Sequence, residues 1–83
     1  MFNTWDKVYI IEMLGYNKDE TKPIFEIKEV YALACYDHPV TKMTMWVLID
    51  HPQCLAVKHR DARAVYKHRI HAENELEARR EYA

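Results

Sequence analysis

The sequence predicts a small α+β domain, with a mostly antiparallel sheet in the order β-α-β-β-α and a long charged C-terminal helix. The run at residues 43–50, Met-Thr-Met-Trp-Val-Leu-Ile-Asp, is the most apolar in the chain, and its β-branched and aromatic residues are typical of a buried strand. Residues 61–82 contain neither Gly nor Pro and are rich in Ala, Glu and Arg, which favours a helix. Hydrophobic residues make up 49% of the 83 residues, which is enough for the core of one domain spanning residues 1–83.

The first predicted element is a strand within residues 5–14. Residues 7–14, Lys-Val-Tyr-Ile-Ile-Glu-Met-Leu, are rich in strand-forming types and end at Gly15, the only glycine of the chain. We expect Gly15 to lie at a bend or to adopt a positive φ. The polar residues 17–22 then form a connection.

The segment 23–36 is compatible with two structures. As a helix it has Thr21 as N-cap and Pro23 in the first turn, where the missing N–H costs nothing. The apolar residues then share one face: Ile24, Ile27, Val30, Tyr31 and Ala34. As a strand, residues 30–36 would pair with residues 43–49 in a three-stranded meander followed by one long helix. The sequence favours the helix here, and the meander stays open as the alternative.

The central strand at residues 43–49 is ended by Asp50-His51-Pro52, because proline cannot donate to a ladder. The short apolar run that follows favours a hairpin, with residues 54–58 as its second strand. The alternative is that residues 52–58 begin a long helix.

The C-terminal helix is expected to begin after Asp61, which is a good N-cap. Its apolar face is narrow: Ala62, Val65, Tyr66, Ala72 and Leu76. Six of the nine residues 73–81 are charged. We interpret them as a solvated end, or alternatively as a helix that pairs with its copy in a dimer.

Composition limits the class of protein. The net charge of −1 creates no strong basic or acidic field, and two cysteines do not make a disulfide scaffold. The N-terminus lacks the basic and apolar regions of a signal peptide, and no apolar run approaches the ~18–20 residues of a membrane span. We therefore expect a cytoplasmic protein with reduced thiols and no membrane partner.

One spacing is that of a tetrahedral zinc site. Cys35 and His38 precede His51 and Cys54 by one strand length, which gives Cys-x₂-His and His-x₂-Cys pairs. The predicted strand between the pairs spans roughly 23 Å at about 3.3 Å per residue, so it holds the pairs apart. The sequence therefore argues against a metal, and we predict no cofactor.

The same cysteine and histidines are the inventory of a thiol enzyme, but nothing in the sequence places them together. The chain has no nucleophile elbow, phosphate loop or dinucleotide motif, and it is short for a deep pocket. No stretch matches the motif of a known family. We predict that the protein is not an enzyme.

A basic segment precedes an acidic end. Residues 51–72 carry a net charge of +4 and residues 73–83 a net charge of −2. On the predicted helix Arg63, Lys67 and His71 form one stripe, which Arg60 would extend. Such a stripe can bind phosphates or an acidic protein surface, and the alternative is a solvated face balanced by local glutamates. The acidic end argues against a long duplex along the whole helix.

The function predicted from these features is protein binding, as a small modulator or inhibitor without catalysis. Two tryptophans and six tyrosines are more than a core of this size can bury, so Trp5 and Trp46 are expected at an interface together with Arg60, Arg63, Lys67 and His71. A homodimer is a further expectation. The alternative function is nucleic-acid binding through the basic stripe.

Overall fold

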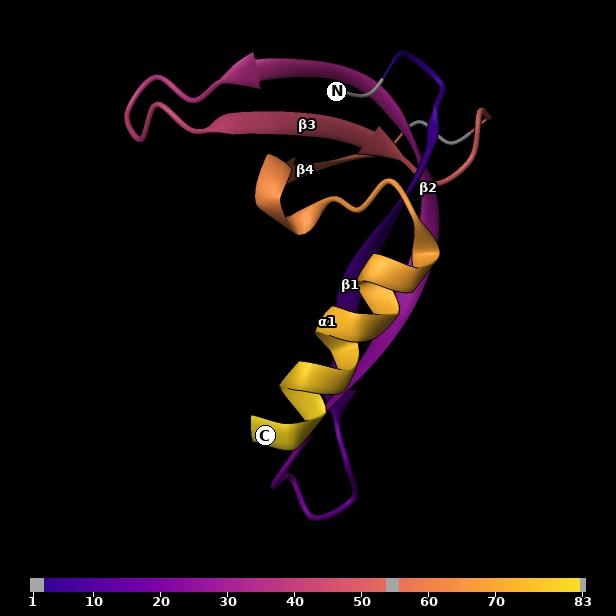
Figure 1. The fold of residues 1–83 in the computed structure, drawn as a ribbon, viewed down its shortest axis with the longest axis vertical. Helices are drawn as coiled ribbons and strands as arrows, with labels where there is room; N and C mark the ends of the chain where they lie inside the picture. The colour runs from indigo at the N-terminus through magenta and orange to yellow at the C-terminus, as the bar shows by residue number, and fades with distance from the viewer. Residues whose placement is uncertain (1–2, 54–55, 83) are drawn as a thin grey trace.

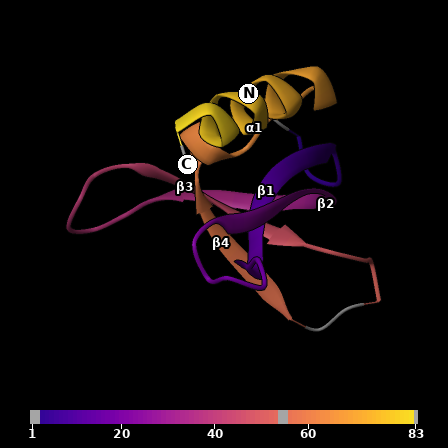
Figure 2. The same ribbon diagram turned by 90° about the horizontal axis from the view of Figure 1, so that it is seen from below.

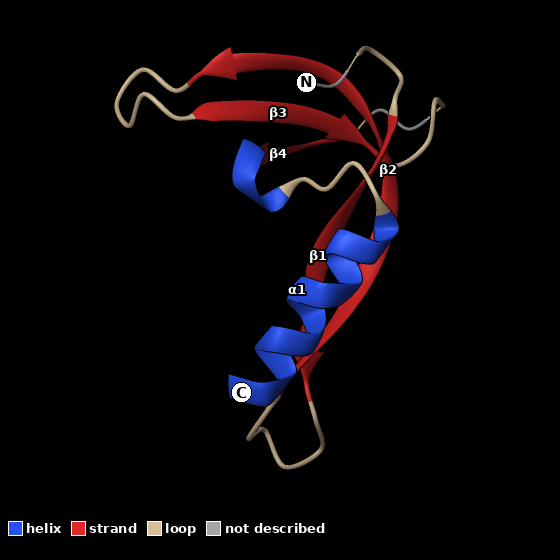
Figure 3. Ribbon diagram, viewed as in Figure 1, coloured by secondary structure: helices blue, strands red, loops and turns tan. Residues whose placement is uncertain are grey.

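The computed structural model describes residues 3–53 and 56–82, which form a four-stranded antiparallel sheet and one α-helix (Figures 1 and 3). The elements are β1 (Lys7–Tyr16), β2 (Pro23–Asp37), β3 (Thr44–Ile49), β4 (Val57–Asp61), the 3₁₀ turn η1 (Ala62–Ala64) and α1 (Arg69–Tyr82). The strands follow one another in the sheet in chain order, as in a meander. The class is therefore α+β, as predicted. Among the described residues, no helix is long and apolar enough to cross a membrane.

Strand β2 is 15 residues long and belongs to two hairpins. Its first half pairs with β1, from Tyr16↔Pro23 to Lys7↔Tyr31, and its second half pairs with β3 as far as Asp37↔Thr44. The register shifts between Ala32 and Ala34, where the strand bends (Figure 1). We call residues 7–31 the β1–β2 arm and residues 32–61 the β2–β4 unit. The two are joined at the bend in β2.

The chain after β4 returns to the outer edge of β1. Asp61 caps η1, because its Oδ1 accepts a hydrogen bond of 2.8 Å from the amide of Arg63. Beyond η1, Tyr66 forms a bridge with Tyr9: each amide donates to the other residue's carbonyl, at 2.8 and 2.9 Å. The curled sheet is thus closed at this point by two backbone hydrogen bonds.

The hydrophobic core fills the inside of this curl. The arm and the β2–β4 unit each contribute three buried side chains, and the return segment contributes Val65. The six are Val8, Ile10 and Val30 from the arm, and Ala32, Trp46 and Leu48 from the other unit. Burying a Val, Leu or Ile side chain stabilises the fold by about 1.5–3 kcal/mol each. The β1–β2 arm and the β2–β4 unit are therefore held together mainly by apolar contacts between their inner faces.

Helix α1 covers the other face of the arm. Phe25 lies five residues from the core residue Val30 on a regular stretch of β2, so its side chain points the opposite way. The guanidinium of Arg79 stacks on the Phe25 ring, 5.6 Å from its centroid. Ala72 and Leu76, which belong to α1, are buried. Figure 2 shows α1 lying on one side of the arm.

The prediction of a helix at residues 23–36 is wrong, and with it the order β-α-β-β-α. The segment is strand because it pairs with a neighbour along both halves, β1 first and then β3. These long-range pairings outweigh the helix propensity of Ala32 and Ala34. The alternative pairing of residues 30–36 with residues 43–49 is confirmed. Gly15 has a φ of 147° at a register shift, as expected.

The predicted helix start at Asp61 is also wrong. Asp61 caps only the three residues of η1, and α1 begins at Arg69. The reason is that Val65 packs in the core and the backbone of Tyr66 forms a β-bridge with Tyr9. A β-bridge requires an extended backbone at Tyr66, so the helix cannot run through this residue. The helix is consequently 14 residues long, shorter than the sequence predicted. The strand predicted at residues 54–58 begins at Val57, and Cys54 lies outside the described residues.

Candidate functional site

The basic stripe predicted on one helix is not formed. Arg63 lies in η1, Lys67 lies in the bend before α1, and only His71 lies within the helix. The guanidinium of Arg63 is held by Asp61, with 3.2 Å between Nη2 and Oδ2. Arg60 lies in β4 and points to the inside of the curl. These four residues therefore do not share one surface.

The two tryptophans differ in their environment. Trp46 is buried in the core, so its side chain is not part of an exposed interface. Trp5 is exposed and stacks edge-to-face on Tyr31, with ring centroids 6.2 Å apart. Its φ of 69° places it in a turn before β1.

The residues of the zinc spacing lie at two ends of β3. The ring Nδ1 of His38 accepts hydrogen bonds from the amides of Val40 and Thr41 in the β2–β3 turn. His51 follows the other end of this six-residue strand, about 3.3 Å per residue away. Cys35 lies in β2 and pairs with Trp46 of β3, three residues before His38 in the chain. Within residues 3–53 and 56–82, no three His, Cys, Asp or Glu side chains converge as metal ligands.

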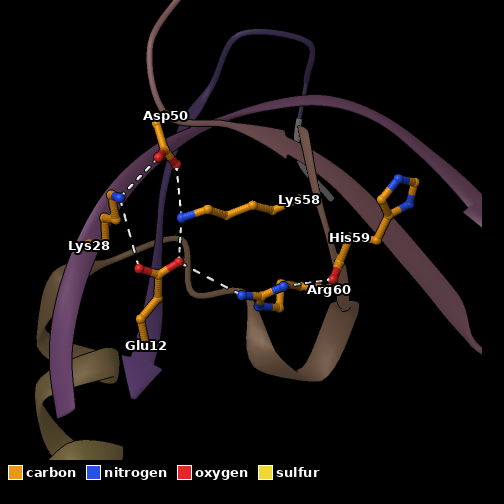
Figure 4. A network of polar contacts seen from close by, with 6 residues as sticks. All are labelled: Glu12, Lys28, Asp50, Lys58, His59 and Arg60. Atoms are coloured by element: carbon orange, nitrogen blue, oxygen red, sulfur yellow. Dashed lines mark hydrogen bonds and ion pairs between the residues drawn. The ribbon is translucent and has the colours of Figure 1, made fainter. Parts of the chain in front are cut away.

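A cluster of ion pairs lies inside the open side of the curl (Figure 4). We call it the clasp, and it consists of Glu12, Lys28, Asp50, Lys58 and Arg60. Lys28 lies 2.9 Å from Asp50 and 3.8 Å from Glu12. Lys58 contacts both carboxylates, at 3.2 Å from Asp50, and Arg60 lies 3.7 Å from Glu12.

Strand alternation places the clasp on the inner face, next to the core. Lys28 pairs directly with Ile10, and Lys58 pairs directly with Leu48. Directly paired residues of antiparallel strands point to the same face. The inside of the curl is therefore apolar at one end and ionic at the other. Since β1 and β4 are not neighbours in the sheet, the contacts of Glu12 with β4 cross the open side.

The clasp contains three cations and two carboxylates, and its side chains are between 17% and 37% exposed. Hydrogen bonding to Lys28 lowers the pKa of Asp50, and the hydrogen bond with Lys58 acts in the same direction against the cost of burial. The same bond to Asp50 raises the pKa of Lys28. Both shifts favour the charged forms of Asp50 and Lys28 in the neutral range.

The end of the β1–β2 arm carries an exposed apolar cluster. Its residues are Met13, Leu14, Tyr16 and Ile24, with 55%, 58%, 56% and 44% of the surface exposed. Ile24 pairs with Gly15, next to the pair Met13↔Phe25, so the exposed apolar residues lie at the same end of the hairpin, with Met13 and Ile24 on opposite faces of its strands. We call these four residues the hairpin tip. In Figure 1 the hairpin extends past the C-terminal end of α1.

The turn between the two strands is ordered by Asn17. Its side-chain Oδ1 accepts a hydrogen bond of 3.0 Å from the backbone amide of Thr21. The backbone amide of Asn17 donates one of 3.0 Å to the carbonyl of Lys22. The four charges around the turn balance: Lys18, Asp19, Glu20 and Lys22. The hairpin tip is therefore a preorganised apolar surface with an electrically neutral rim.

Two shallow hollows flank η1, with volumes of about 390 and 350 Å³. Arg63 and Asp61 line both of them, and Glu75 and Arg79 line the second. Each guanidinium is already paired with a carboxylate of the same hollow, at 3.2 Å in both cases. The hollows consequently offer little uncompensated charge to a ligand.

Sequence reasoning missed both features. The clasp joins residues that are up to 48 positions apart, from Glu12 to Arg60, and the neighbours of a charged residue depend on how the sheet curls. The hairpin tip had a local signal, because Met13 and Leu14 stand next to the only glycine and a polar turn. Comparison with protein-family models, with curated proteins and with solved structures found no match.

Proposed function

We propose that this chain is a small protein-binding module without catalysis, and that the hairpin tip is its contact surface. One observation carries the proposal. Among the described residues, four of the nine exposed large hydrophobic side chains gather at this one end of the molecule. Single exposed apolar residues are ordinary on protein surfaces, whereas several of them gathered at one end of a molecule favour an interaction site.

The chemistry of the hairpin tip suits a protein partner. Tyr16 offers a large ring with a polar end, and Met13 offers a flexible side chain that adapts to irregular surfaces. Aromatic residues and Met are enriched in the centres of protein interfaces, where charged residues are depleted. The hydrogen bonds of Asn17 order the turn before binding, which reduces the conformational entropy lost on association.

The geometry gives less support to nucleic-acid binding. Of the basic segment, Lys58 and Arg60 are turned inward to Glu12, and Arg63 is held by Asp61. A surface that binds phosphates needs uncompensated cations arranged along one face. The structure pairs these three cations. Of the other two in the segment, Lys67 lies in the bend before α1, and Arg69 lies in α1 and pairs with Glu73 at 3.1 Å.

Site-specific photo-cross-linking in an extract of the native cells tests the proposal. A photoreactive residue replaces Leu14 in one sample and Val40, which is 81% exposed in the β2–β3 turn, in the control. We expect discrete protein adducts at position 14 that persist after nuclease treatment and disappear in Tyr16→Ser. An adduct of twice the chain mass would identify the partner as a second copy. Equal adducts at both positions, or adducts lost with nuclease, would contradict the proposal.

A further inference from the structure

We propose that the clasp is a salt-sensitive contact that holds β4 against the β1–β2 arm. When the clasp loosens, the arm and the β2–β4 unit move apart about the bend in β2. Each hairpin keeps its own strand pairing when they part. The inference is independent of what the hairpin tip binds. It assigns a conformational role to a charge cluster that the binding surface does not use.

The connectivity shows why the two hairpins can move as units. Among the described residues, β2 is the strand that the arm and the β2–β4 unit share. The pairing partner of β2 changes from β1 to β3 at Tyr31. The register shift between Ala32 and Ala34 lies immediately after this change. Bulges of this kind let a strand turn a corner between two packed layers. The bend is therefore a natural hinge.

Two sets of polar contacts among the described residues tie the arm across the open side. One is the clasp, through Glu12 and Lys28 of the arm and Asp50, Lys58 and Arg60 of the other unit. The second is the pair of backbone hydrogen bonds between Tyr9 of the arm and Tyr66, which follows the β2–β4 unit and η1 in the chain. The remaining tie is the apolar core, in which Ile10 and Leu48 lie next to the clasp. Opening the clasp exposes this end of the core first.

The exposure of the clasp makes its strength depend on ionic strength. Its side chains retain 17% to 37% of their surface in solvent, so salt ions reach them. The screening length is roughly 10 Å at 0.1 M salt and roughly 3 Å at 1 M. Partly exposed ion pairs weaken accordingly. The apolar core does not weaken in the same way, so salt loosens this one tie selectively.

Native-state hydrogen exchange on the full chain distinguishes parting from unfolding. The reporters of parting are the amides of Tyr9 and Tyr66, which donate between the arm and the segment that follows β4 and η1. The reference amides are those of the β1–β2 and β3–β4 ladders, which stay paired when the hairpins separate. In Glu12→Gln, exchange at the two reporters should rise about fivefold to tenfold with the ladder amides unchanged. Raising salt from about 20 mM to about 500 mM should produce the same pattern in the unmodified chain.

Two further variants keep the test decisive. Lys58→Met removes a clasp cation and should also raise exchange at Tyr9 and Tyr66. The matched control is Glu29→Gln, because Glu29 pairs with Lys7 at 3.5 Å between the same strands but on the outside. That control should leave the reporters unchanged. A uniform rise at all amides in both clasp variants, or no rise at the reporters, would overturn the proposal.

Discussion

Glu12 and Arg60 form an ion pair of 3.7 Å between Oε1 and Nη2, although they belong to the first and the last strand of the sheet. In a flat meander of this order two strands would separate them. The pair therefore records the curl of the sheet. It also turns the charged side chains of an edge strand inward, which discourages pairing of that edge with another chain.

Asp50→Asn is expected to remove an acid-sensitive part of the stability. The hydrogen bond from Lys28 lowers the pKa of Asp50 below its ordinary value of 3.8. A carboxyl group with a lowered pKa in the folded state stabilises the fold above its unfolded pKa, and this contribution is lost as the pH falls through the folded pKa. Between about pH 6 and about pH 2.5, wild type should lose on the order of 0.5–1 kcal/mol more than the variant.

Urea unfolding at a series of pH values measures this difference. Glu29→Gln serves as the control, because its partner Lys7 is an exposed outer residue. Equal pH dependence in wild type and Asp50→Asn would mean that Asp50 gains nothing from the clasp in the folded state.

Leu48→Ala should be the most damaging of the conservative core truncations. Leu48 is fully buried between the two hairpins, and truncation leaves a cavity that the crossing strands cannot fill by moving together. The expected loss is about 2–5 kcal/mol in the free energy of unfolding, measured by denaturant titration. Val40→Ala should change it by less than about 0.5 kcal/mol. Similar losses in the two variants would place Leu48 outside the core.

Gly15→Ala tests the backbone at the register shift in β1. A Cβ at this position would meet no atom within 4 Å, so space does not forbid it, but the φ of +147° is one that L side chains rarely adopt. We expect a loss of about 1–2 kcal/mol from conformational strain alone. Thermal unfolding measures it. An unchanged melting temperature would show that the strand end relaxes to a negative φ.

The sequence was sufficient for elements whose local pattern agrees with their tertiary role. The strand predicted at residues 43–49 is β3, and the strand that ends at Gly15 is β1. The errors arose where pairing partners decide the structure. Residues 23–36 satisfy a helical apolar pattern and a strand pattern equally well, and only β1 and β3 on either side of the segment resolve it.

The same reasoning explains the missed site. Asp61 is a true N-cap, but its helical turn ends at Ala64. The backbone of Tyr66 forms a β-bridge with Tyr9, which lies 52 residues before Asp61 in the sequence. The sequence predicts Arg60 as an extension of a basic helix stripe, whereas in the structure Arg60 lies in β4 and pairs with Glu12, which has no local relation to it in the sequence. Contacts of this kind are set by the curl of the sheet and not by the spacing of residues along the chain.

Tyr66 should ionise above the ordinary tyrosine pKa of 10.0 when the protein is titrated with base. Burial raises the pKa of Tyr66, and the nearby carboxylate of Glu75 raises it further, while Arg79 acts in the opposite direction. A pKa raised in the folded state means that the neutral phenol stabilises the fold below its unfolded pKa, and that this contribution is lost as the pH rises through the folded value. Ultraviolet difference titration should therefore show a phenol that ionises above the ordinary tyrosine pKa of 10.0 in the wild type, and this ionisation should be missing in Tyr66→Phe. In Glu75→Gln the Tyr66 step should move to lower pH, whereas Glu73→Gln, which removes the partner of Arg69 at 3.1 Å, should leave it in place. Equal shifts in both variants would show that general helix charge governs the Tyr66 pKa, and that Glu75 has no specific effect on it.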